Sequence, residues 1–226
     1  MTTDINNELN KDVFRENLIK YTRKAFQMLP PMENQRILDV GCGTGVPTME
    51  LARLSQGEII GLDIDQPSLN KLDNKIKQAA LTSRIKTIKC SMFEMDFPDE
   101  NFDLIWAEGV LSRISFEKSL KDWQRFLKPK GFLVMHDAIR FIEKDLEKIS
   151  ICGFALFGNF KLPEDAFWIE YYKPLQKRID ELRIKYANDA DALSVLDNEQ
   201  REIDSFKKNP GLDSSGFYLL QKEKHT

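Results

Sequence analysis

Arg36-Ile-Leu-Asp-Val-Gly-Cys-Gly-Thr-Gly-Val46 is the stretch that decides the fold of this chain. Its first half is a short apolar run around Leu38, which is typical of a strand buried on both faces. Pro47 suits the first turn of a helix that starts directly after the run of glycines. The stretch therefore predicts a strand, a tight turn and a helix, with backbone N–H groups open to a ligand. The turn is built on three glycines, Gly41, Gly43 and Gly45.

The spacing of these glycines differs from that of a dinucleotide-binding turn. In the dinucleotide fingerprint the third glycine stands three residues after the second, and here Val46 occupies that place. Asp39 lies inside the strand, two residues before the first glycine. A carboxylate there would repel a pyrophosphate and attract an ammonium group. The predicted ligand is a nucleoside that carries an amino acid.

Asp39-Val-Gly-Cys-Gly-Thr-Gly45 resembles the first motif of the class I S-adenosylmethionine-dependent methyltransferases. Later motifs of that family follow in order up to residue 137, and the tail resembles a subgroup that acts on small molecules. The resemblance implies an α/β fold, a Rossmann-like, mostly parallel seven-stranded sheet with helices on both faces. It also implies S-adenosylmethionine as cofactor, S-adenosylhomocysteine as product, and cofactor contacts from the whole glycine turn, Cys42 included.

A second apolar segment, Glu58 to Asp63, predicts another buried strand that ends in an acid. Asp63 follows Gly41 at close to the interval of about 20 residues at which a βαβ unit places a carboxylate over a ribose. A carboxylate accepts hydrogen bonds from both ribose hydroxyls. The alternative role is a helix N-cap, for which Asp65 or Ser68 is better placed. With Asp63 on the ribose, Ile64 is expected against one face of the adenine.

The third predicted strand, residues 85–90, is followed by Ser91 and Met92. The resemblance implies that the Ser91 hydroxyl and the Met92 amide contact the adenine. The alternative for Met92 is a place in the core, the commoner position of a methionine.

Three further polar residues follow the fourth and fifth predicted strands, and they are the candidate catalytic residues. Glu108 closes the strand at 104–107, and the alternative to a pocket role is a surface or helix-start role. His136 and Asp137 follow the strand at 132–135, and strand alternation sends only one of them toward the pocket. An unperturbed histidine titrates near neutrality, which suits removal of a proton from an acceptor. The alternative is a structural His136 satisfied by a backbone group.

The chain after Asp137 predicts a helix over residues 138–149 and a strand over 153–162. The late strands are expected to pair at the edge of the sheet, and the last one, at 216–221, is expected to run antiparallel, as the resemblance implies. The N-terminal residues 1–10 are polar and are expected to be loose. An amphipathic helix is predicted over 11–29, and its Tyr21 is a candidate neighbour of the cofactor.

Apolar residues at alternating steps of three and four predict a helical hairpin over residues 164–208. We expect it to be a cover inserted before the last strand of a single domain that spans residues 1–226. Most of the cover is expected to be structural. Its aromatic residues Trp168, Tyr171 and Tyr172 also suit a pocket wall.

Composition restricts the partners and the compartment. The chain has 226 residues, 42% of them hydrophobic, and a formal net charge of −3, which fits one sizeable core and disfavours nucleic acid as a partner. Cys42, Cys90 and Cys152 are widely separated, which favours a reducing, cytoplasmic compartment over a disulfide framework. With two histidines in the chain and no ligand spacing, no metal is expected. No segment predicts a membrane span, and a monomer or homodimer is expected.

The sequence thus predicts methyl transfer from S-adenosylmethionine to a nucleophile on a small-molecule acceptor. Two alternatives stay open. One is a methyltransferase that acts on protein or RNA. The other is a cofactor-binding regulatory module without turnover, since the fold alone does not fix the function.

Overall fold

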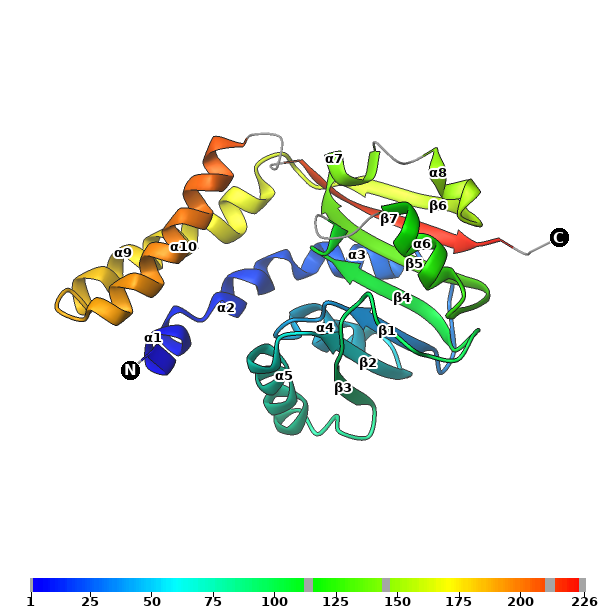
Figure 1. Cartoon of the computed structure of the whole chain (residues 1–226), viewed down its shortest axis with the longest axis horizontal. Coiled ribbons are helices and arrows are strands. Elements are labelled where there is room, and N and C mark those ends of the chain that lie inside the picture. The colour runs from blue at the N-terminus through cyan, green and yellow to red at the C-terminus, as the bar shows by residue number, and fades with distance from the viewer. Residues whose placement is uncertain (1, 112–115, 144–146, 210–213, 224–226) are drawn as a thin grey trace.

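The structure, a computed structural model, describes residues 2–111, 116–143, 147–209 and 214–223. In these residues a seven-stranded sheet has the order β3-β2-β1-β4-β5-β7-β6 (Figure 1). Strand β7 runs antiparallel to both of its neighbours, and the pairs among β1 to β5 are parallel. The predicted fold class and the antiparallel last strand are therefore confirmed. The strands are β1 (Arg36–Val40), β2 (Glu58–Asp63), β3 (Ile85–Lys89), β4 (Phe102–Glu108), β5 (Leu127–Ala138), β6 (Phe154–Lys161) and β7 (Ser215–Lys222).

Helices cover both faces of the sheet, as predicted, because the strands are apolar on both faces. Neighbouring residues of β4 show this, since Trp106 packs into one layer and Ala107 into the other. The layer with Trp106 contains α3 (Ile19–Gln27), α4 (Val46–Leu54) and α5 (Gln66–Gln78). The layer with Ala107 contains α6 (Phe116–Gln124), α7 (Ile139–Ile142) and α8 (Lys148–Ile151).

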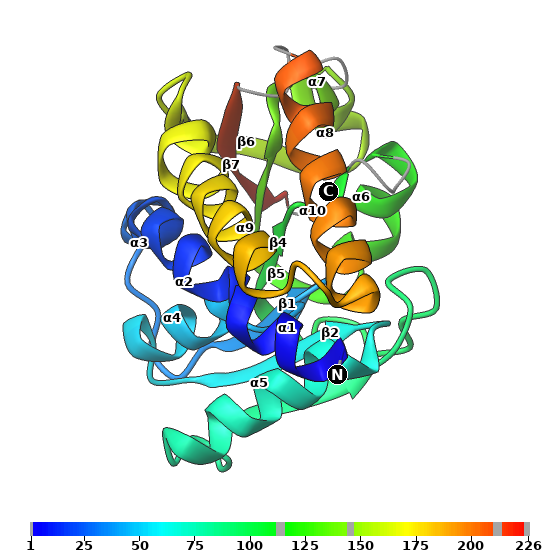
Figure 2. The same ribbon diagram turned by 90° about the vertical axis from the view of Figure 1, so that its left-hand side faces the viewer.

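A third apolar cluster lies away from the sheet and belongs to helices from both ends of the chain. Figures 1 and 2 show α9 (Lys173–Lys185) and α10 (Ala190–Lys208) as a hairpin, with α1 (Thr2–Leu9) near the end where the two helices are joined. The π-helical turn Trp168–Tyr172 leads into α9, and α2 (Lys11–Arg15) follows α1. The cover predicted over residues 164–208 therefore also includes α1 and α2, and from here on the name cover means all of these helices.

The expectation of a loose N-terminus is wrong. Ile5 and Leu9 are spaced one helical turn apart, and both are buried against the hairpin. Glu8 accepts a hydrogen bond from Tyr186 at 2.6 Å and pairs with Lys185 at the same distance. The sequence did not predict this helix because its apolar face consists of only two residues in an otherwise polar segment.

Two helix predictions are corrected in their extent. The helix predicted over 11–29 is divided, because a 3₁₀ turn at Glu16–Leu18 separates α2 from α3. In place of the helix predicted over 138–149, β5 continues to Ala138 and the short helices α7 and α8 follow. Residues 144–146 lie outside the described residues. The first residue of the predicted helix, Ala138, pairs with Ser215 of β7 and so belongs to the sheet instead.

Candidate active site

The three glycines of the turn after β1 all have positive φ, but their surroundings differ. A Cβ on Gly41 would lie 2.4 Å from Val110, and one on Gly45 would lie 2.2 Å from Leu72. These two positions are closed by packing. A Cβ on Gly43, where φ is +52°, would meet nothing within 4 Å. Gly43 therefore presents bare backbone to open space, which is what close approach of a ligand requires.

Hydrogen bonds hold this turn against the end of β2. The N–H groups of Gly41 and Cys42 donate to the Leu62 carbonyl at 2.7 and 3.0 Å. The N–H of Gly43 donates to Oδ2 of Asp63 at 2.8 Å. The Asp63 carboxylate thus fixes the turn and stands beside the open face of Gly43.

The other oxygen of Asp63 accepts from the N–H of Asp65 at 2.9 Å. Asp65 itself accepts from the N–H of Ser68, also at 2.9 Å, and so caps α5. The helix cap is therefore on Asp65, one of the two residues expected to serve it. Asp63 is left at the mouth of the turn with two lone pairs not used by the backbone.

Asp39 is buried beneath the turn. Its Oδ2 accepts a hydrogen bond from the hydroxyl of Thr48 at 2.6 Å. Burial raises the pKa of Asp39 to about 7, and the negative charges of Glu108 and Asp63 add to the rise. This carboxyl is therefore poised to ionise near neutral pH when a cation approaches.

Glu108 ends β4, in the centre of the sheet order, and faces α3. Its Oε1 accepts from the indole N–H of Trp106 at 2.7 Å and from the hydroxyl of Thr22 at 2.9 Å. Burial raises the pKa of Glu108 to about 7. Oε2 has no hydrogen-bond partner within the described parts of the chain. One oxygen is thus fixed by the protein, and the other is available in the cavity.

His136 is held in an aromatic stack on the α3 side of the sheet. Its ring stacks on Phe217 at 4.5 Å and on Phe167 at 5.8 Å between ring centres. Its Nε2 lies 3.2 Å from the hydroxyl of Ser215. Burial lowers the pKa of His136 to about 4, so the imidazole is neutral at physiological pH.

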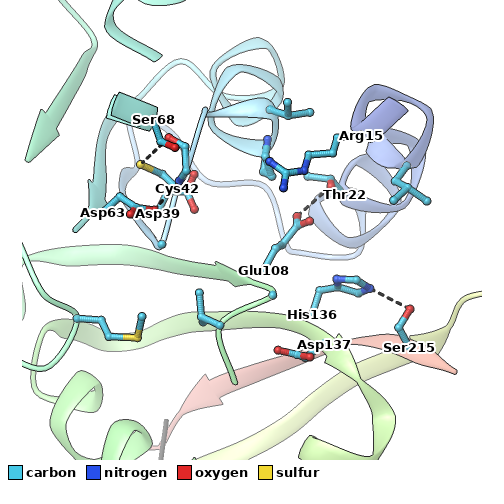
Figure 3. A pocket seen from close by; sticks show the side chains of 18 of the residues that line it. Arg15, Thr22, Asp39, Cys42, Asp63, Ser68, Glu108, His136, Asp137 and Ser215 are labelled. Carbon is cyan, nitrogen blue, oxygen red and sulfur yellow. Dashed lines mark hydrogen bonds between the residues drawn. The ribbon is translucent and has the colours of Figure 1, made fainter. Parts of the chain in front are cut away.

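Asp137 points to the opposite face of β5, as strand alternation requires. Its Oδ2 accepts from the N–H of Leu111 and its Oδ1 from the N–H of Ala138, both at 2.8 Å. Both His136 and Asp137 nevertheless border the cavity, because β5 ends there. Figure 3 shows Asp39, Asp63 and Glu108 around the same opening.

A cavity of about 730 Å³ connects these residues. Such a volume suits a nucleoside-sized ligand together with a second small molecule. On the β1–β3 side it is lined by the glycine turn, Asp63, Ile64, Ser91, Met92 and Phe93. On the β5–β7 side it is lined by Leu18, Ile19, Leu162, Phe167, Tyr172, Phe206 and Phe217. The second group is apolar and aromatic, and His136, Asp137 and Ser215 add polar side chains on the same side of the cavity.

Of the three cover aromatics expected in the pocket wall, Tyr172 borders the cavity. Tyr171 is buried in the cover core, and Trp168 packs against that core with Lys207 over its ring. Phe167, directly before the π-helical turn, also borders the cavity. Tyr21, singled out from the sequence, also borders it and donates to Glu170 at 3.0 Å.

Sequence reasoning missed several residues that support the site. Thr48 carried a weak signal, because it lies in the first turn of the helix that the glycine turn opens. Thr22, Phe167 and Ser215 carried none, because each comes from a segment distant in sequence from its partner.

Within the described ranges, no helix is long and apolar enough to cross a membrane. Over the same ranges, no three His, Cys, Asp or Glu side chains are grouped so as to hold a metal ion.

The chain is similar to known methyltransferases in sequence. A sterol 24-C-methyltransferase of Candida albicans is 27% identical over 187 residues, which are 76% of this chain and 50% of the relative. A ubiquinone/menaquinone biosynthesis C-methyltransferase of Vibrio campbellii is 27% identical over 82% of this chain and 67% of its own. The chain spans about half the length of the first curated relatives it matches.

Solved structures share the fold. The cyclase SpnF has a TM-score of 0.75 at 19% identity, over 91% of this chain and 81% of its own. A methyltransferase of Geobacter sulfurreducens in complex with S-adenosylhomocysteine has a TM-score of 0.72 at 14% identity, over 90% and 91%. A family model described as a methyltransferase domain matches residues 31–178, which is more than half of the chain. The chain therefore belongs to the methyltransferase domain family.

Proposed function

We propose that this protein transfers a methyl group from S-adenosylmethionine to a nucleophile on a small-molecule acceptor. The observation that carries the proposal is the pairing of the open Gly43 backbone with the Asp63 carboxylate at one end of a cavity. Membership of the methyltransferase domain family supports it. So do the names of the relatives, which act on a sterol and in quinone biosynthesis.

The residues on the β1–β3 side fit the cofactor. Asp63 offers its unused lone pairs to the two ribose hydroxyls, and Asp39 is the partner of the methionyl ammonium group. Ile64, with 66% of its surface exposed, is available to pack on the adenine. The complete proposed cofactor set is Asp39, Gly41, Cys42, Gly43, Gly45, Asp63, Ile64, Ser91, Met92 and Glu108.

The bound cofactor supplies a methyl group on an intrinsically reactive sulfonium. The protein orients the acceptor so that its nucleophile lies in line with the methyl carbon and the sulfur, and it excludes water. A lone pair of the acceptor forms the new bond to carbon, and the C–S electron pair stays on sulfur. An acceptor that is protonated at neutral pH also requires a group that takes its proton.

Among the three candidate catalytic residues, the geometry favours Glu108 as that group. Its pKa of about 7 is close to the operating pH, and its Oε2 is available. A cationic cofactor lowers the pKa of a neighbouring carboxyl, so cofactor binding puts Glu108 in its basic form. Asp137 accepts two main-chain hydrogen bonds, and neutral His136 is fixed in an aromatic stack. We assign those two residues to shaping the β5–β7 side of the cavity, which we call the acceptor side because the proposed cofactor residues lie on the other side.

We propose the cover, residues 164–208 together with α1 and α2, as the wall that closes the acceptor side within one domain. Phe206 of α10 and Tyr172 border the cavity while the rest of the hairpin packs on the N-terminal helices. Three features stay predictions from the sequence: a cytoplasmic location, no nucleic-acid partner, and a monomeric or homodimeric state.

A regulatory module without turnover is the second candidate. It stays open because the fold and a cofactor site do not by themselves imply turnover. A panel of apolar and polar small molecules, incubated with the protein and S-adenosylmethionine, separates the candidates by release of S-adenosylhomocysteine. We expect release with at least one small acceptor. Binding without release across the panel would favour the module, and release only with added protein or RNA would favour a macromolecular acceptor.

A further inference from the structure

Arg15 is a cation at a cavity whose other charged side chains are acids. Among the described residues that border the cavity it is the one lysine or arginine, facing Asp39, Asp63, Asp65, Glu108 and Asp137 across that space. Its guanidinium lies 5.9 Å from the centre of the Tyr171 ring. No hydrogen bond or ion pair to it occurs in the parts of the chain that the structure describes. Figure 3 shows the side chain reaching from its helix toward the space beside the glycine turn.

The helix that carries Arg15 is anchored on the glycine turn itself. Asp12, one turn earlier on α2, accepts hydrogen bonds from the hydroxyl of Thr44 at 2.5 Å and from Lys75 at 2.8 Å. Lys75 also donates to the carbonyl of Thr44 at 2.9 Å. Thr44 stands between Gly43 and Gly45. Arg15 is therefore held at a fixed place relative to the part of the cavity that the turn forms.

The same N-terminal end of α2 is also fixed to the hairpin. Lys11 pairs with Glu199 of α10 at 2.9 Å. The helix thus has one contact to the turn and one to the cover, and both are made by charged residues about one helical turn before Arg15. These pairings occupy Lys11 and Asp12. The N–H donors of the Arg15 guanidinium remain for a partner that the protein does not supply.

We infer that Arg15 binds the carboxylate of the amino-acid portion of the cofactor. The inference rests on the proposed function. An amino acid carries its ammonium and carboxylate groups on one carbon, so a ligand with its ammonium near Asp39 has its carboxylate at the glycine turn as well. The planar guanidinium matches a carboxylate with two parallel hydrogen bonds. Arg15 then balances the acids of the cavity and fixes the zwitterionic end of the ligand.

Two ligands that differ only in the carboxylate test this inference by titration calorimetry. The first is S-adenosylhomocysteine, and the second is its decarboxylated analogue, which keeps the ammonium group. We expect Arg15→Gln to weaken S-adenosylhomocysteine binding roughly 10- to 100-fold and to leave binding of the analogue unchanged. Arg15→Lys keeps the positive charge but not the planar, bidentate guanidinium. Its affinity for S-adenosylhomocysteine should lie between those of the wild type and Arg15→Gln.

Lys24→Gln is the matched control, because it removes one positive charge from α3 at a residue that packs over Phe160, outside the cavity. It should change neither affinity, and thermal unfolding checks that each variant is folded. Equal losses for both ligands in Arg15→Gln, or no loss for either, would overturn the assignment. A wild-type protein that binds neither ligand would instead refute the proposed function.

Discussion

The backbone N–H of Gly43 donates to the Asp63 carboxylate over 2.8 Å, and this bond joins the turn after β1 to the end of β2. The bond brings the two predicted cofactor residues of one βαβ unit into contact. It also sets the orientation of Asp63, because the carboxylate oxygen that accepts from Gly43 cannot turn away from the cavity without losing this partner. The proposed cofactor site is thus preorganised by its own backbone.

Replacement of Gly43 should separate binding from folding. Gly43→Ala and Gly43→Val both place a side-chain residue at φ +52°, which costs roughly 1–2 kcal/mol of stability in each. The valine methyl groups also project into the cavity, so Gly43→Val should abolish binding of S-adenosylhomocysteine while the protein stays folded. Calorimetry with thermal unfolding measures both effects. Binding by Gly43→Val at wild-type affinity would mean that the open face of the turn is not the ligand site.

Gly45 offers the contrasting case. A Cβ there would lie 2.2 Å from Leu72, so Gly45→Ala should destabilise the protein more than Gly43→Ala does. A similar stability for the two alanine variants would contradict the packing described for the turn.

The raised pKa of Asp39 makes stability depend on pH. Between the unfolded pKa near 4 and the folded pKa of about 7, the folded state binds the extra proton, so this group destabilises the protein as the pH rises through that window. The slope is at most about 1.4 kcal/mol per pH unit. Asp39→Asn removes it, so the variant should gain stability over the wild type between pH 4 and 7, with no further gain above.

Chemical denaturation at a series of pH values measures this difference. The exposed Asp96→Asn is the control for loss of one carboxyl, and its curve should run parallel to the wild type. A parallel curve for Asp39→Asn as well would show that Asp39 is not a protonated buried acid near neutral pH. The lowered pKa of His136 acts in the opposite sense, because stability from that group is lost as the pH falls from about 6.5 to about 4.

The proposed base is tested on an acceptor from the panel screen. Glu108→Gln keeps the shape of the side chain and should lower turnover roughly 10²- to 10⁴-fold. Because the glutamine oxygen can still accept from Thr22 and Trp106, the side chain should stay in place, and S-adenosylhomocysteine affinity should fall far less than turnover. His136→Asn should cause a smaller loss. The reverse order of the two losses would return the base role to His136, and unchanged turnover in both would mean that placement alone suffices.

The cover is tested through its own apolar core. Leu9 is 2% exposed between α1 and the hairpin, so Leu9→Ala should cost about 2–5 kcal/mol of packing there. Hydrogen exchange should accelerate in α1, α9 and α10, with little change in β1 to β4. Val13→Ala, at a residue 51% exposed, is the control. Acceleration that spreads evenly over the sheet would contradict a separate cover core.

What the sequence predicted well was local. Asp39, Gly43 and Asp63 belong to one strand–turn–helix–strand unit, whose geometry is set by short spacings that the sequence displays directly. The antiparallel last strand came from the resemblance and was confirmed. These features need no knowledge of which distant segments meet.

What the sequence could not predict depends on long-range placement. Thr22 reaches Glu108 only because α3 packs over β4, and Ser215 reaches His136 only because β7 inserts beside β5 in one register. The docking of α1 was missed because two apolar residues, Ile5 and Leu9, give too little periodicity against a polar background. In each case the partner lies far away in sequence, so no local pattern records the contact.

Titration of S-adenosylhomocysteine into wild type and Asp63→Ala tests whether S-adenosylmethionine binds in this cavity with its ribose on Asp63. We expect that the wild type binds and that Asp63→Ala loses about 1.5–3 kcal/mol of binding free energy, because a charge-assisted contact to the ribose is removed. Asp63→Asn, which still accepts from the Gly43 N–H, should lose part of this. Unchanged affinity in Asp63→Ala would refute the ribose contact, and no binding by the wild type would refute the cofactor site.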